Sequence, residues 1–359
     1  MVNKHSSYDL KQMQAVPLEQ KIAMTKRRIR EWYDYWDGMV YVSFSGGKDS
    51  TVLKHIVDSM HLDVPAVFVN TGLEYPEIQK FVRDMKAGKY DCFNSDIEIL
   101  RPEMRFDEVV KKYGYPVASK EVSRRIYYAR KAIQEGRHEN HGDYLHLTGE
   151  AVDKEGRKSR YNCSKWFFLL DAPFKISPFC CDVMKKNPIK KYKKQTGRKT
   201  ILGMMANESA LRMQAWIRNG CNAFNSKDPT SSPMSFWTEQ DVLHYIKEYD
   251  VPYASVYGHI VPTSDEYQIE GQLTTFDIFG EYERTKLTTT GCKRTGCIFC
   301  MFGCHLEKEP NRFQRLKETH PNQYEYCIGG GEMVDGKWQP SKEGLGLGKV
   351  LDYINVKYK

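Results

Sequence analysis

The sequence predicts an α/β protein with a doubly wound parallel sheet, and two observations lead to that fold class. Short apolar runs rich in β-branched residues alternate along the chain with segments whose apolar residues recur at helical spacing. Glycine-containing turns stand between several of these runs and the helical segments that follow. Strands that alternate with helices form parallel sheets, and ligands of such sheets bind at the carboxyl ends of the strands.

The expected elements follow in chain order. Residues 8–37 are rich in Lys, Arg and Glu and predict one or two helices that cap the domain. Strands are expected at residues 39–44, 64–69, 97–100 and 200–205. Helices are expected at residues 51–60, 76–85, 106–113, 119–135 and 238–249. Pro76 suits a first helical turn, Gly114 suits a helix end, and Ser119 and Thr238 are the expected N-caps of their helices.

The length of 359 residues leaves room for about two domains. We expect an N-terminal helical cap over residues 1–37, a nucleotide-binding α/β domain over 38–250, and a cysteine-rich, irregular C-terminal region over 251–359. Residues 136–165 are polar and contain four glycines, so they are expected to be an inserted loop or a short hairpin.

Composition limits the class of protein and the chemistry of its cysteines. The chain is 40% hydrophobic, no apolar run approaches the ~20 residues that span a bilayer, and the N-terminus lacks the apolar core of a signal peptide. We therefore expect a cytoplasmic protein with no membrane partner. In a reducing compartment the ten cysteines are expected to be metal or cluster ligands, or reactive thiols, rather than disulfides. The net charge of +8 fits an anionic nucleotide or a nucleic acid and does not choose between them.

The most informative stretch lies between the first strand and the helix that follows it, and reads Ser45-Gly46-Gly47-Lys48-Asp49-Ser50. The two glycines allow a sharp turn and a close approach of a ligand to the backbone amides. The helix N-terminus carries unpaired N–H groups and the positive end of the helix dipole, so it favours a phosphate. Lys48 adds a positive charge, and Ser45 and Ser50 add hydroxyl donors.

A second polar segment follows the second strand and reads Asn70-Thr71-Gly72-Leu73-Glu74. Because ligands of a parallel sheet lie at the carboxyl ends of its strands, we expect this segment and the Ser45–Ser50 loop to face one pocket. Asn70, Gly72 and Glu74 are therefore candidate nucleotide contacts.

The Ser45–Ser50 loop lacks the longer glycine spacing and the terminal Lys-Ser/Thr pair of a Walker P-loop. It resembles instead the PP-loop of the ATP pyrophosphatase superfamily. The resemblance implies that the loop grips the β- and γ-phosphates of ATP, which is cleaved between the α and β phosphates to activate a substrate. Lys48 would then neutralise charge on the leaving pyrophosphate, and Mg²⁺ would bridge phosphates with Asp49 as a ligand, which makes both residues catalytic candidates. The alternative is a glycine turn beside a solvated lysine.

Two groups of cysteines predict a metal centre. Cys180 and Cys181 are adjacent, and far downstream there is a C-x4-C-x2-C-x3-C run formed by Cys292, Cys297, Cys300 and Cys304. Thiolates at C-x-x-C spacing can grip one metal centre from a single turn. A local closure would use all four cysteines of the run. A long-range closure would join Cys180 and Cys181 to Cys297 and Cys300.

Four segments together resemble the phosphoadenosine phosphosulfate (PAPS) reductase family. In family order they are Cys180-Cys181 followed by Lys185, Lys186 and Pro188; Gly203 through Arg212; Ser232 through Val242; and Gly296 through Cys300. In the iron–sulfur branch of that family, a Cys-Cys pair and a C-x-x-C hold a [4Fe-4S] cluster. The resemblance therefore implies the long-range ligand set of Cys180, Cys181, Cys297 and Cys300. Zinc comes second, because its sites prefer two to four residues between paired ligands, and a set of buried structural thiols comes third.

Two departures from that family bear on the reaction. The loop is intact where sulfonucleotide reductases usually have a degenerate one, which points to ATP as the substrate. The chain also lacks the Glu-Cys-Gly-Leu-His tail that carries the catalytic cysteine of those reductases. Cys327 lies a comparable distance beyond the C-x-x-C pair and is the candidate nucleophile, with a buried or incidental thiol as the alternative.

We therefore expect an ATP-dependent enzyme that activates an acceptor, releases pyrophosphate and supports sulfur transfer with the cluster. A thiol protein or a cysteine desulfurase would supply the sulfur or electrons. The first alternative is a reductase that converts PAPS or adenylylsulfate to sulfite. The second is a nucleotide- or nucleic-acid-binding module without turnover.

Two basic runs bear on whether the acceptor is a nucleic acid. They comprise Lys185, Lys186, Lys190, Lys191, Lys193, Lys194, Arg198 and Lys199, and then Arg124, Arg125, Arg130, Lys131 and Arg137. Tyr127, Tyr128 and Tyr192 interleave these charges, so a phosphate-backbone track with stacking aromatics and two solvated helix faces remain as alternatives. Arg101, Lys120 and Arg212 are candidate anion contacts near the strand ends, by position and resemblance.

Overall fold

The computed structural model describes residues 3–263 and 285–359, and its contacts divide the chain into two compact units. Unit 1 comprises Met1–Asn70, Glu74–Leu100 and Lys191–Thr295, and unit 2 comprises Thr71–Leu73, Arg101–Lys190 and Gly296–Lys359. This division differs from the predicted boundaries. Residues 101–190, expected within the nucleotide-binding domain, group with the C-terminal segment, and residues 1–37 belong to unit 1. Residues 264–284 of the predicted C-terminal region lie outside the described residues.

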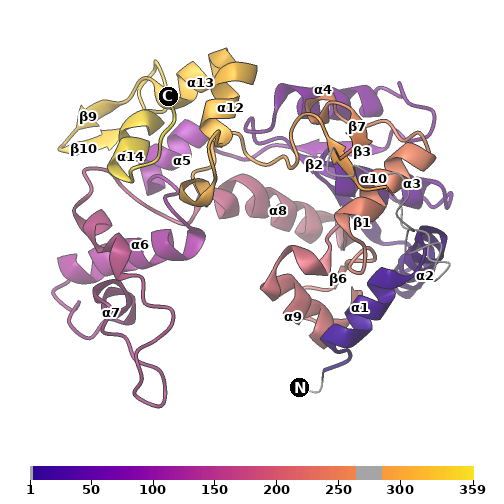
Figure 1. Ribbon diagram of the computed structural model, residues 1–359, viewed down its shortest axis with the longest axis horizontal. Helices are drawn as coiled ribbons and strands as arrows, with labels where there is room; N and C mark the ends of the chain where they lie inside the picture. The colour runs from indigo at the N-terminus through magenta and orange to yellow at the C-terminus, as the bar shows by residue number, and fades with distance from the viewer. Residues whose placement is uncertain (1–2, 264–284) are drawn as a thin grey trace, which may run out of the picture. The chain divides into compact units, whose positions relative to one another are not determined.

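A six-stranded sheet with the order β3-β2-β1-β4-β6-β5 forms the centre of unit 1 (Figure 1). Its strands are β1 (Val40–Phe44), β2 (Ala66–Val69), β3 (Ile97–Leu100), β4 (Lys199–Leu202), β5 (Asn222–Ala223) and β6 (Thr230–Ser231). All neighbouring pairs are parallel except β5 with β6. Val42 of β1 is in register with Ala66 of β2 on one side and with Ile201 of β4 on the other. The predicted α/β fold with a parallel sheet is confirmed.

The order of the strands places a topological switch point between β1 and β4. From β1 the chain moves outward to β2 and then to β3, and it later returns to the opposite side of β1 to form β4. Loops that leave the carboxyl ends of β1 and β4 therefore diverge, which opens a crevice where ligands of such sheets bind.

The helices of unit 1 supply the rest of its core. They are α1 (Ser7–Ala15), α2 (Leu18–Tyr35), α3 (Lys48–Asp58), α4 (Pro76–Lys86), α9 (Ala210–Asn219), α10 (Glu239–Glu248) and the 3₁₀ turns η3 (Ala206–Glu208) and η4 (Ser255–Tyr257). A short antiparallel pair, β7 (Ile260–Pro262) with β8 (Leu287–Thr289), follows. Both α2 and α10 pack on α3, and Lys21 of α2 forms a 2.7 Å ion pair with Asp241 of α10. Because Trp32 of α2 is fully buried in the same core, the N-terminal helices form an integral layer of the unit.

Capping residues, a proline and a glycine correctly predicted the ends of several helices. Ser119 caps its helix through a hydrogen bond from the Val122 amide, and Thr238 and Asp241 form a reciprocal capping box. Pro76 lies in the first turn of α4, and Gly114 ends its helix.

Unit 2 is mainly helical. Its elements are α5 (Phe106–Tyr113), α6 (Lys120–Gln134), α7 (Gly142–Thr148), η1 (Ser164–Asp171), the π-helical turn η2 (Asp182–Lys186), η5 (Cys304–Leu306), α12 (Arg312–Thr319), α13 (Pro321–Ile328), β9 (Glu332–Val334), β10 (Lys337–Gln339) and α14 (Leu347–Tyr353). The remaining helix, α8 (Asn187–Thr196), contains the boundary between the units. Contacts within unit 2 join segments that are far apart in the sequence. For example, the buried hydroxyl of Tyr115 donates to the carbonyl of Leu345 at 2.8 Å.

Two sequence expectations for unit 2 need correction. The segment 136–165 contains helix α7 as well as an isolated antiparallel bridge between Val152 and Lys158, so it is more than a loop or hairpin. The region after residue 296 is not irregular throughout, because it contains three α-helices and a β9–β10 hairpin. Asn311 is the N-cap of α12 and forms a capping box, and Pro321 is the first residue of α13. Both are ordinary sequence signals for the start of a helix.

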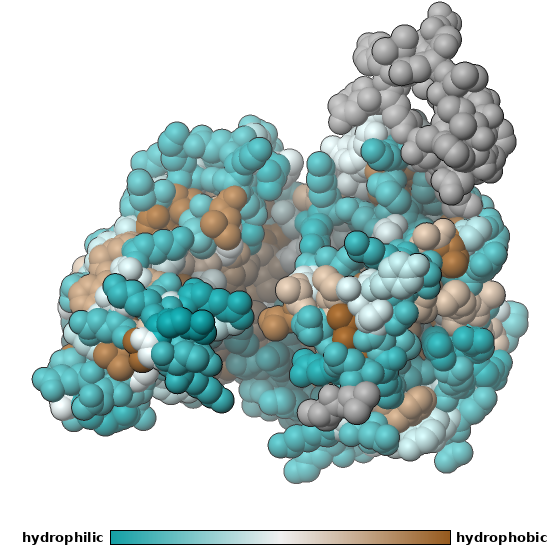
Figure 2. All heavy atoms as spheres, turned by 60° about the horizontal axis from the view of Figure 1, so that its bottom comes forward, coloured by the Kyte–Doolittle hydropathy of each residue, from teal (hydrophilic) through white to brown (hydrophobic). Residues whose placement is uncertain are grey.

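The face shown in Figure 2 is largely hydrophilic, and its apolar residues form small separate patches. Among the residues that the structure describes, no helix is both long enough and apolar enough to cross a membrane.

Candidate active site

The loop between β1 and α3 forms a tight cradle. Gly46 adopts a positive φ of 71°, and a Cβ there would lie 2.8 Å from the side chain of Ile78, so only glycine suits this turn. Gly47 is the N-cap of α3. The Ser45 amide donates to Ser50 Oγ at 3.2 Å, and the Ser50 hydroxyl donates to the Gly47 carbonyl at 2.9 Å. These bonds fix the loop before any ligand binds.

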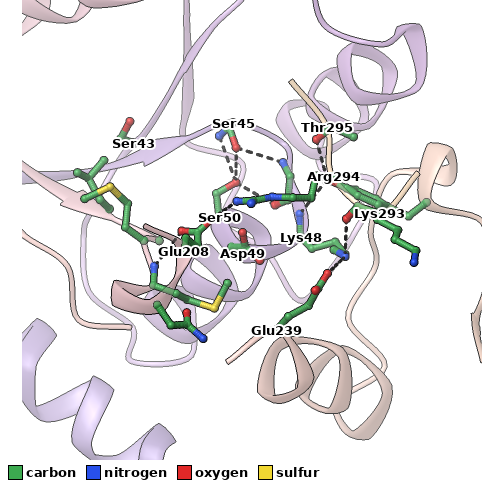
Figure 3. Close-up of a pocket in the computed structure, with 17 residues that line it drawn as sticks. Ser43, Ser45, Lys48, Asp49, Ser50, Glu208, Glu239, Lys293, Arg294 and Thr295 are labelled. Carbon is green, nitrogen blue, oxygen red and sulfur yellow. Dashed lines mark hydrogen bonds and ion pairs between the residues drawn. The ribbon is translucent and has the colours of Figure 1, made fainter. Parts of the chain in front are cut away.

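A cavity of about 550 Å³ opens in front of this loop, and we call it the nucleotide cavity (Figure 3). It lies at the β1/β4 switch point, because its walls come from the end of β1, the loop, the end of β4 and a segment that follows β8. Its lining residues are Ser43, Ser45, Gly47, Lys48, Asp49, Ser50, Leu202, Gly203, Met204, Met205, Asn207, Glu208, Glu239, Tyr257, Lys293, Arg294 and Thr295. Gly203 allows β4 to approach the loop closely, since a Cβ there would lie 2.9 Å from the Asp49 carbonyl oxygen.

Lys48 is the central cation of the nucleotide cavity. Its side chain is 5% exposed, and its Nζ lies 3.1 Å from Glu239 Oε1 and 2.9 Å from the carbonyl oxygen of Lys293. The ammonium also lies over the ring of Tyr257. A buried ammonium needs such partners, and an incoming phosphate would replace them with stronger ones.

Asp49 and Glu208 join Glu239 as carboxylates of this cavity (Figure 3). Burial raises the pKa of Asp49, and the charges of Lys48 and Arg294 oppose that rise. Glu208 forms ion pairs with both Arg212 and Arg294, and its side chain is only 9% exposed. One carboxylate is thus shared by two guanidinium groups beside the phosphate cradle, and an anionic ligand is able to engage the same groups.

The segment before the C-x-x-C pair forms one wall of the nucleotide cavity. The Lys293 carbonyl accepts from Lys48, Arg294 pairs with Glu208, and the Thr295 hydroxyl lies 2.7 Å from the Tyr257 hydroxyl. Burial raises the pKa of Tyr257 to about 12, so this phenol stays protonated and is able to donate.

The structure brings together most, though not all, of the predicted nucleotide-binding residues. Ser45, Gly47, Lys48, Asp49 and Ser50 line the nucleotide cavity, and Gly46 shapes the turn behind it. The described residues that line the cavity do not include Asn70, Gly72 or Glu74. The reason is topological, because the cavity opens between β1 and β4 whereas this segment follows β2 on the other side of β1. Arg212 lines an adjoining cavity and reaches the site through Glu208.

Several site residues were not identified from the sequence, namely Glu208, Glu239, Tyr257, Lys293, Arg294 and Thr295. Glu208 and Glu239 lie within segments that resemble the PAPS reductase family, so the resemblance is the sequence feature that could have identified them. Arg294 lies between Cys292 and Cys297, in a short polar segment that carries no recognisable motif apart from the cysteine spacing. Tyr257 gave no signal, because its role depends on tertiary contacts.

The four cysteines of the long-range set all belong to unit 2. Burial raises the pKa of the Cys180 thiol, and the neighbouring thiols of Cys297, Cys181 and Cys300 raise it further. Burial likewise raises the pKa of Cys300, where Arg312 and Lys185 oppose the rise. The four thiols are therefore electrostatic neighbours. Cys292, which the local closure requires, belongs to unit 1.

The donor set fits an anionic cluster in its chemistry. Cationic Lys185 and Arg312 act on the thiols, and a cluster held by four thiolates carries negative charge that such cations stabilise. Over residues 3–263 and 285–359, no group of three or more His, Cys, Asp or Glu side chains is arranged to hold a single metal ion. A four-iron cluster is larger than one ion, so its ligand sulfurs stand farther apart.

Comparison with known protein families decides the membership of the chain. The family described as the phosphoadenosine phosphosulfate reductase domain matches residues 39–162 and 168–301. The chain belongs to this family. The matched residues include the Ser45–Ser50 loop, the Cys180-Cys181 pair and the C-x-x-C pair.

Individual relatives of this PAPS reductase family member share shorter stretches. The uncharacterized protein MJ0066 of Methanocaldococcus jannaschii is 39% identical over 89 residues, which are 24% of this chain and 18% of the relative. The uncharacterized protein MJ0973 of the same organism is 33% identical over 91 residues, which are 24% of this chain and 21% of the relative. The chain thus spans about a fifth of the length of these curated relatives. A crystal structure of phosphoadenylyl-sulfate (PAPS) reductase from Candida auris in a phosphate complex matches 71% of this chain and 92% of its own, with 15% identity and a TM-score of 0.37.

Cys327 of this PAPS reductase family member is fully buried, and burial raises its pKa well above the ordinary value. A nucleophilic cysteine needs an accessible thiolate, so the geometry favours the structural alternative over the predicted catalytic role.

Replacing Cys327 with alanine should therefore leave nucleotide turnover within about twofold of wild type while lowering the free energy of unfolding by roughly 1 kcal/mol through lost packing. Turnover and thermal melting measured on the same preparation check both effects. Cys92→Ala, at an exposed cysteine, is the matched control. Abolished turnover in a variant of unchanged stability would restore the catalytic role.

The basic run around α6 is less available to a nucleic acid than the sequence suggested. Arg130 donates to four backbone carbonyls at 2.7–3.0 Å, those of Leu169, Leu170, Ala172 and Phe174. Arg124 pairs with Glu121 and Asp143. Tyr192 is 3% exposed and packs edge-on against Tyr41, so it offers no face for stacking. In the run around α6, these arginines stabilise unit 2 rather than form a phosphate track.

Proposed function

We propose that this PAPS reductase family member binds ATP at the Ser45–Ser50 loop, cleaves it between the α and β phosphates to activate an acceptor, and supports sulfur transfer to that acceptor. One observation carries the proposal: Lys48 and the N-terminus of α3 meet in one cavity at the β1/β4 switch point. A buried lysine beside the positive end of a helix dipole suits a polyphosphate. PAPS and adenylylsulfate have no β- and γ-phosphates to offer this cradle.

The side chains of the cavity suggest how the activation step proceeds. Bound ATP takes the Lys48 ammonium from Glu239, so that the ammonium and the loop amides lie on the β- and γ-phosphates. An acceptor oxygen forms a bond to the α-phosphorus while the bond from that phosphorus to the bridging oxygen breaks, and pyrophosphate leaves with the electron pair. Lys48 and the amides stabilise the charge that develops on the leaving group. Mg²⁺ supplies further charge neutralisation when bound, and Asp49 is the residue that would hold it.

The sulfur step follows from the chemistry of the adenylated acceptor. A sulfide-level sulfur nucleophile forms a bond to the acceptor atom that carries the adenylate, the bond from that atom to oxygen breaks, and AMP leaves. A cysteine desulfurase supplies the sulfur as a persulfide, and a thiol protein supplies the two electrons that reduce the outer sulfur of that persulfide to the sulfide level. Cys180, Cys181, Cys297 and Cys300 would hold a [4Fe-4S] cluster, which when bound supplies iron sites for sulfide or electrons.

The family match favours one second candidate, a reductase that forms sulfite from PAPS or adenylylsulfate. Such a reaction needs two electrons from a thiol donor and no ATP. Its thiol step would require an accessible cysteine, and the buried position of Cys327 weighs against that residue.

Parallel anaerobic incubations with ATP, PAPS or adenylylsulfate separate the two candidates. We expect pyrophosphate from ATP in the presence of Mg²⁺, and no sulfite from either sulfonucleotide with a thiol donor. Sulfite formation without ATP consumption would overturn the proposal in favour of the reductase.

A further inference from the structure

A second cavity of about 460 Å³ adjoins the nucleotide cavity in unit 1. The two cavities share Leu202, Met204 and Met205 as wall residues, so they meet along the segment that leaves β4. The volume falls within the range of about 300–1,000 Å³ that is common for small-molecule sites. The Ser45–Ser50 loop does not line this second cavity, so it is distinct from the phosphate cradle.

Apolar side chains form one part of the second cavity, and those on α9 include an exposed leucine. Leu211 and Ala215 of α9 (Figure 1) line it, and Leu211 is 83% exposed. Met204 and Met205 contribute thioethers, which are polarisable and pack well against flat aromatic rings. An apolar wall of this kind suits the face of a planar ring.

Polar groups form the other part of the second cavity. The hydroxyls of Ser226, Thr230 and Ser235 each donate to a carbonyl of this chain, at 2.6–3.2 Å. Their remaining lone pairs are acceptors for N–H groups of a ligand. A ligand with an apolar face and a polar edge that carries amino or imino donors fits this wall, and nucleobases have that chemistry.

Basic side chains lie at and near the rim of the second cavity, and two of them are held by carboxylates. Arg212 lines it, and Asp228, another lining residue, forms an ion pair with Lys193 of α8. The neighbouring Lys194 is exposed on the same helix. The phosphates of a backbone that continues from an inserted base are able to replace these carboxylate partners and to contact the exposed Lys194.

We propose that the second cavity receives a single unstacked nucleobase of a polynucleotide, whose atoms are thereby presented to the adjoining nucleotide cavity. This inference rests on the proposed function, because it identifies the acceptor that ATP would activate. Extruding a base costs unstacking energy, which is least for single strands, so single-stranded DNA or RNA is the preferred form.

Ala215→Trp tests the proposal by filling the second cavity from an exposed helix position. Ala23→Trp, at an exposed position of α2, is the matched control. Fluorescence anisotropy with labelled single-stranded DNA and RNA oligonucleotides in separate arms measures polynucleotide affinity. A fluorescent ATP analogue measures the nucleotide cavity, and thermal melting checks folding.

We expect wild type and Ala23→Trp to bind at least one of the two oligonucleotides, and Ala215→Trp to bind it at least tenfold more weakly with unchanged affinity for the ATP analogue. The arm that binds identifies the acceptor as DNA or RNA. Equal oligonucleotide affinity of Ala215→Trp and wild type, or no binding of either oligonucleotide by wild type, would overturn the proposal. Weakened binding of the ATP analogue by Ala215→Trp would also overturn it, because the cavity would then hold the adenine of ATP. Failure of the proposed function appears separately, as an absence of pyrophosphate release despite intact oligonucleotide binding.

Discussion

Replacing Lys48 with alanine is expected to lower pyrophosphate release by about 100-fold or more, the usual effect of removing one preorganised donor from developing negative charge. The ammonium is a buried cation of the nucleotide cavity, and its loss leaves the helix N-terminus, the serine hydroxyls and Arg294 to contact a phosphate. Weaker binding of ATP should accompany the loss of turnover. Isothermal titration with a non-hydrolysable ATP analogue and a pyrophosphate assay measure the two effects.

The fold should survive the Lys48→Ala change. The partner carboxylate of Glu239 is 54% exposed and is able to return to water, so no buried charge is left without a partner. Lys80→Ala, which removes an exposed lysine from an ion pair on α4, is the control for a general loss of positive charge. Equal ATP affinity of Lys48→Ala and wild type would remove the loop from the nucleotide site.

The double change Cys180→Ala with Cys181→Ala is expected to reduce bound iron from about four per chain to background in anaerobically purified protein. Wild type should be brown, with visible absorbance that the double variant loses. The physical reason is the electrostatic closeness of Cys180 to Cys181, Cys297 and Cys300 within unit 2. Iron analysis and visible absorption spectra check this result, and Cys92→Ala is the control for loss of any one thiol.

Two results would contradict the long-range ligand set. Retained iron in the double variant would favour the local closure through Cys292 and Cys304. Stoichiometric zinc without visible absorbance in wild type would reject the cluster altogether.

The sequence was informative wherever the signal was local. The β1–loop–α3 unit combines a β-branched run, two glycines and a helical repeat within about twenty residues, and it folds as those neighbours dictate. Ser119 and Thr238 identified helix starts for the same reason, since a capping hydrogen bond joins residues only three apart in the chain.

Non-local contacts explain what the sequence did not reveal. Residues 101–190 were assigned to the nucleotide-binding domain by continuity, whereas contacts such as Tyr115 with Leu345 group them with the C-terminal segment. Arg294 became a site residue only because the chain returns to the end of β4 and sets it beside Glu208. Asn70 and Glu74 follow a strand end as expected, but the side of β1 on which the crevice opens depends on where β4 inserts.

The ion pair between Lys48 and Glu239 must be broken before a ligand can bind the Lys48 ammonium in the nucleotide cavity. Glu239 presents a carboxylate to the ammonium, so every incoming anion competes with an internal one. A ligand with a single weak charge gains little by that exchange. On the proposed function, a triphosphate that engages the ammonium and the helix N-terminus together gains more, so the ion pair would favour a polyphosphate over a smaller anion.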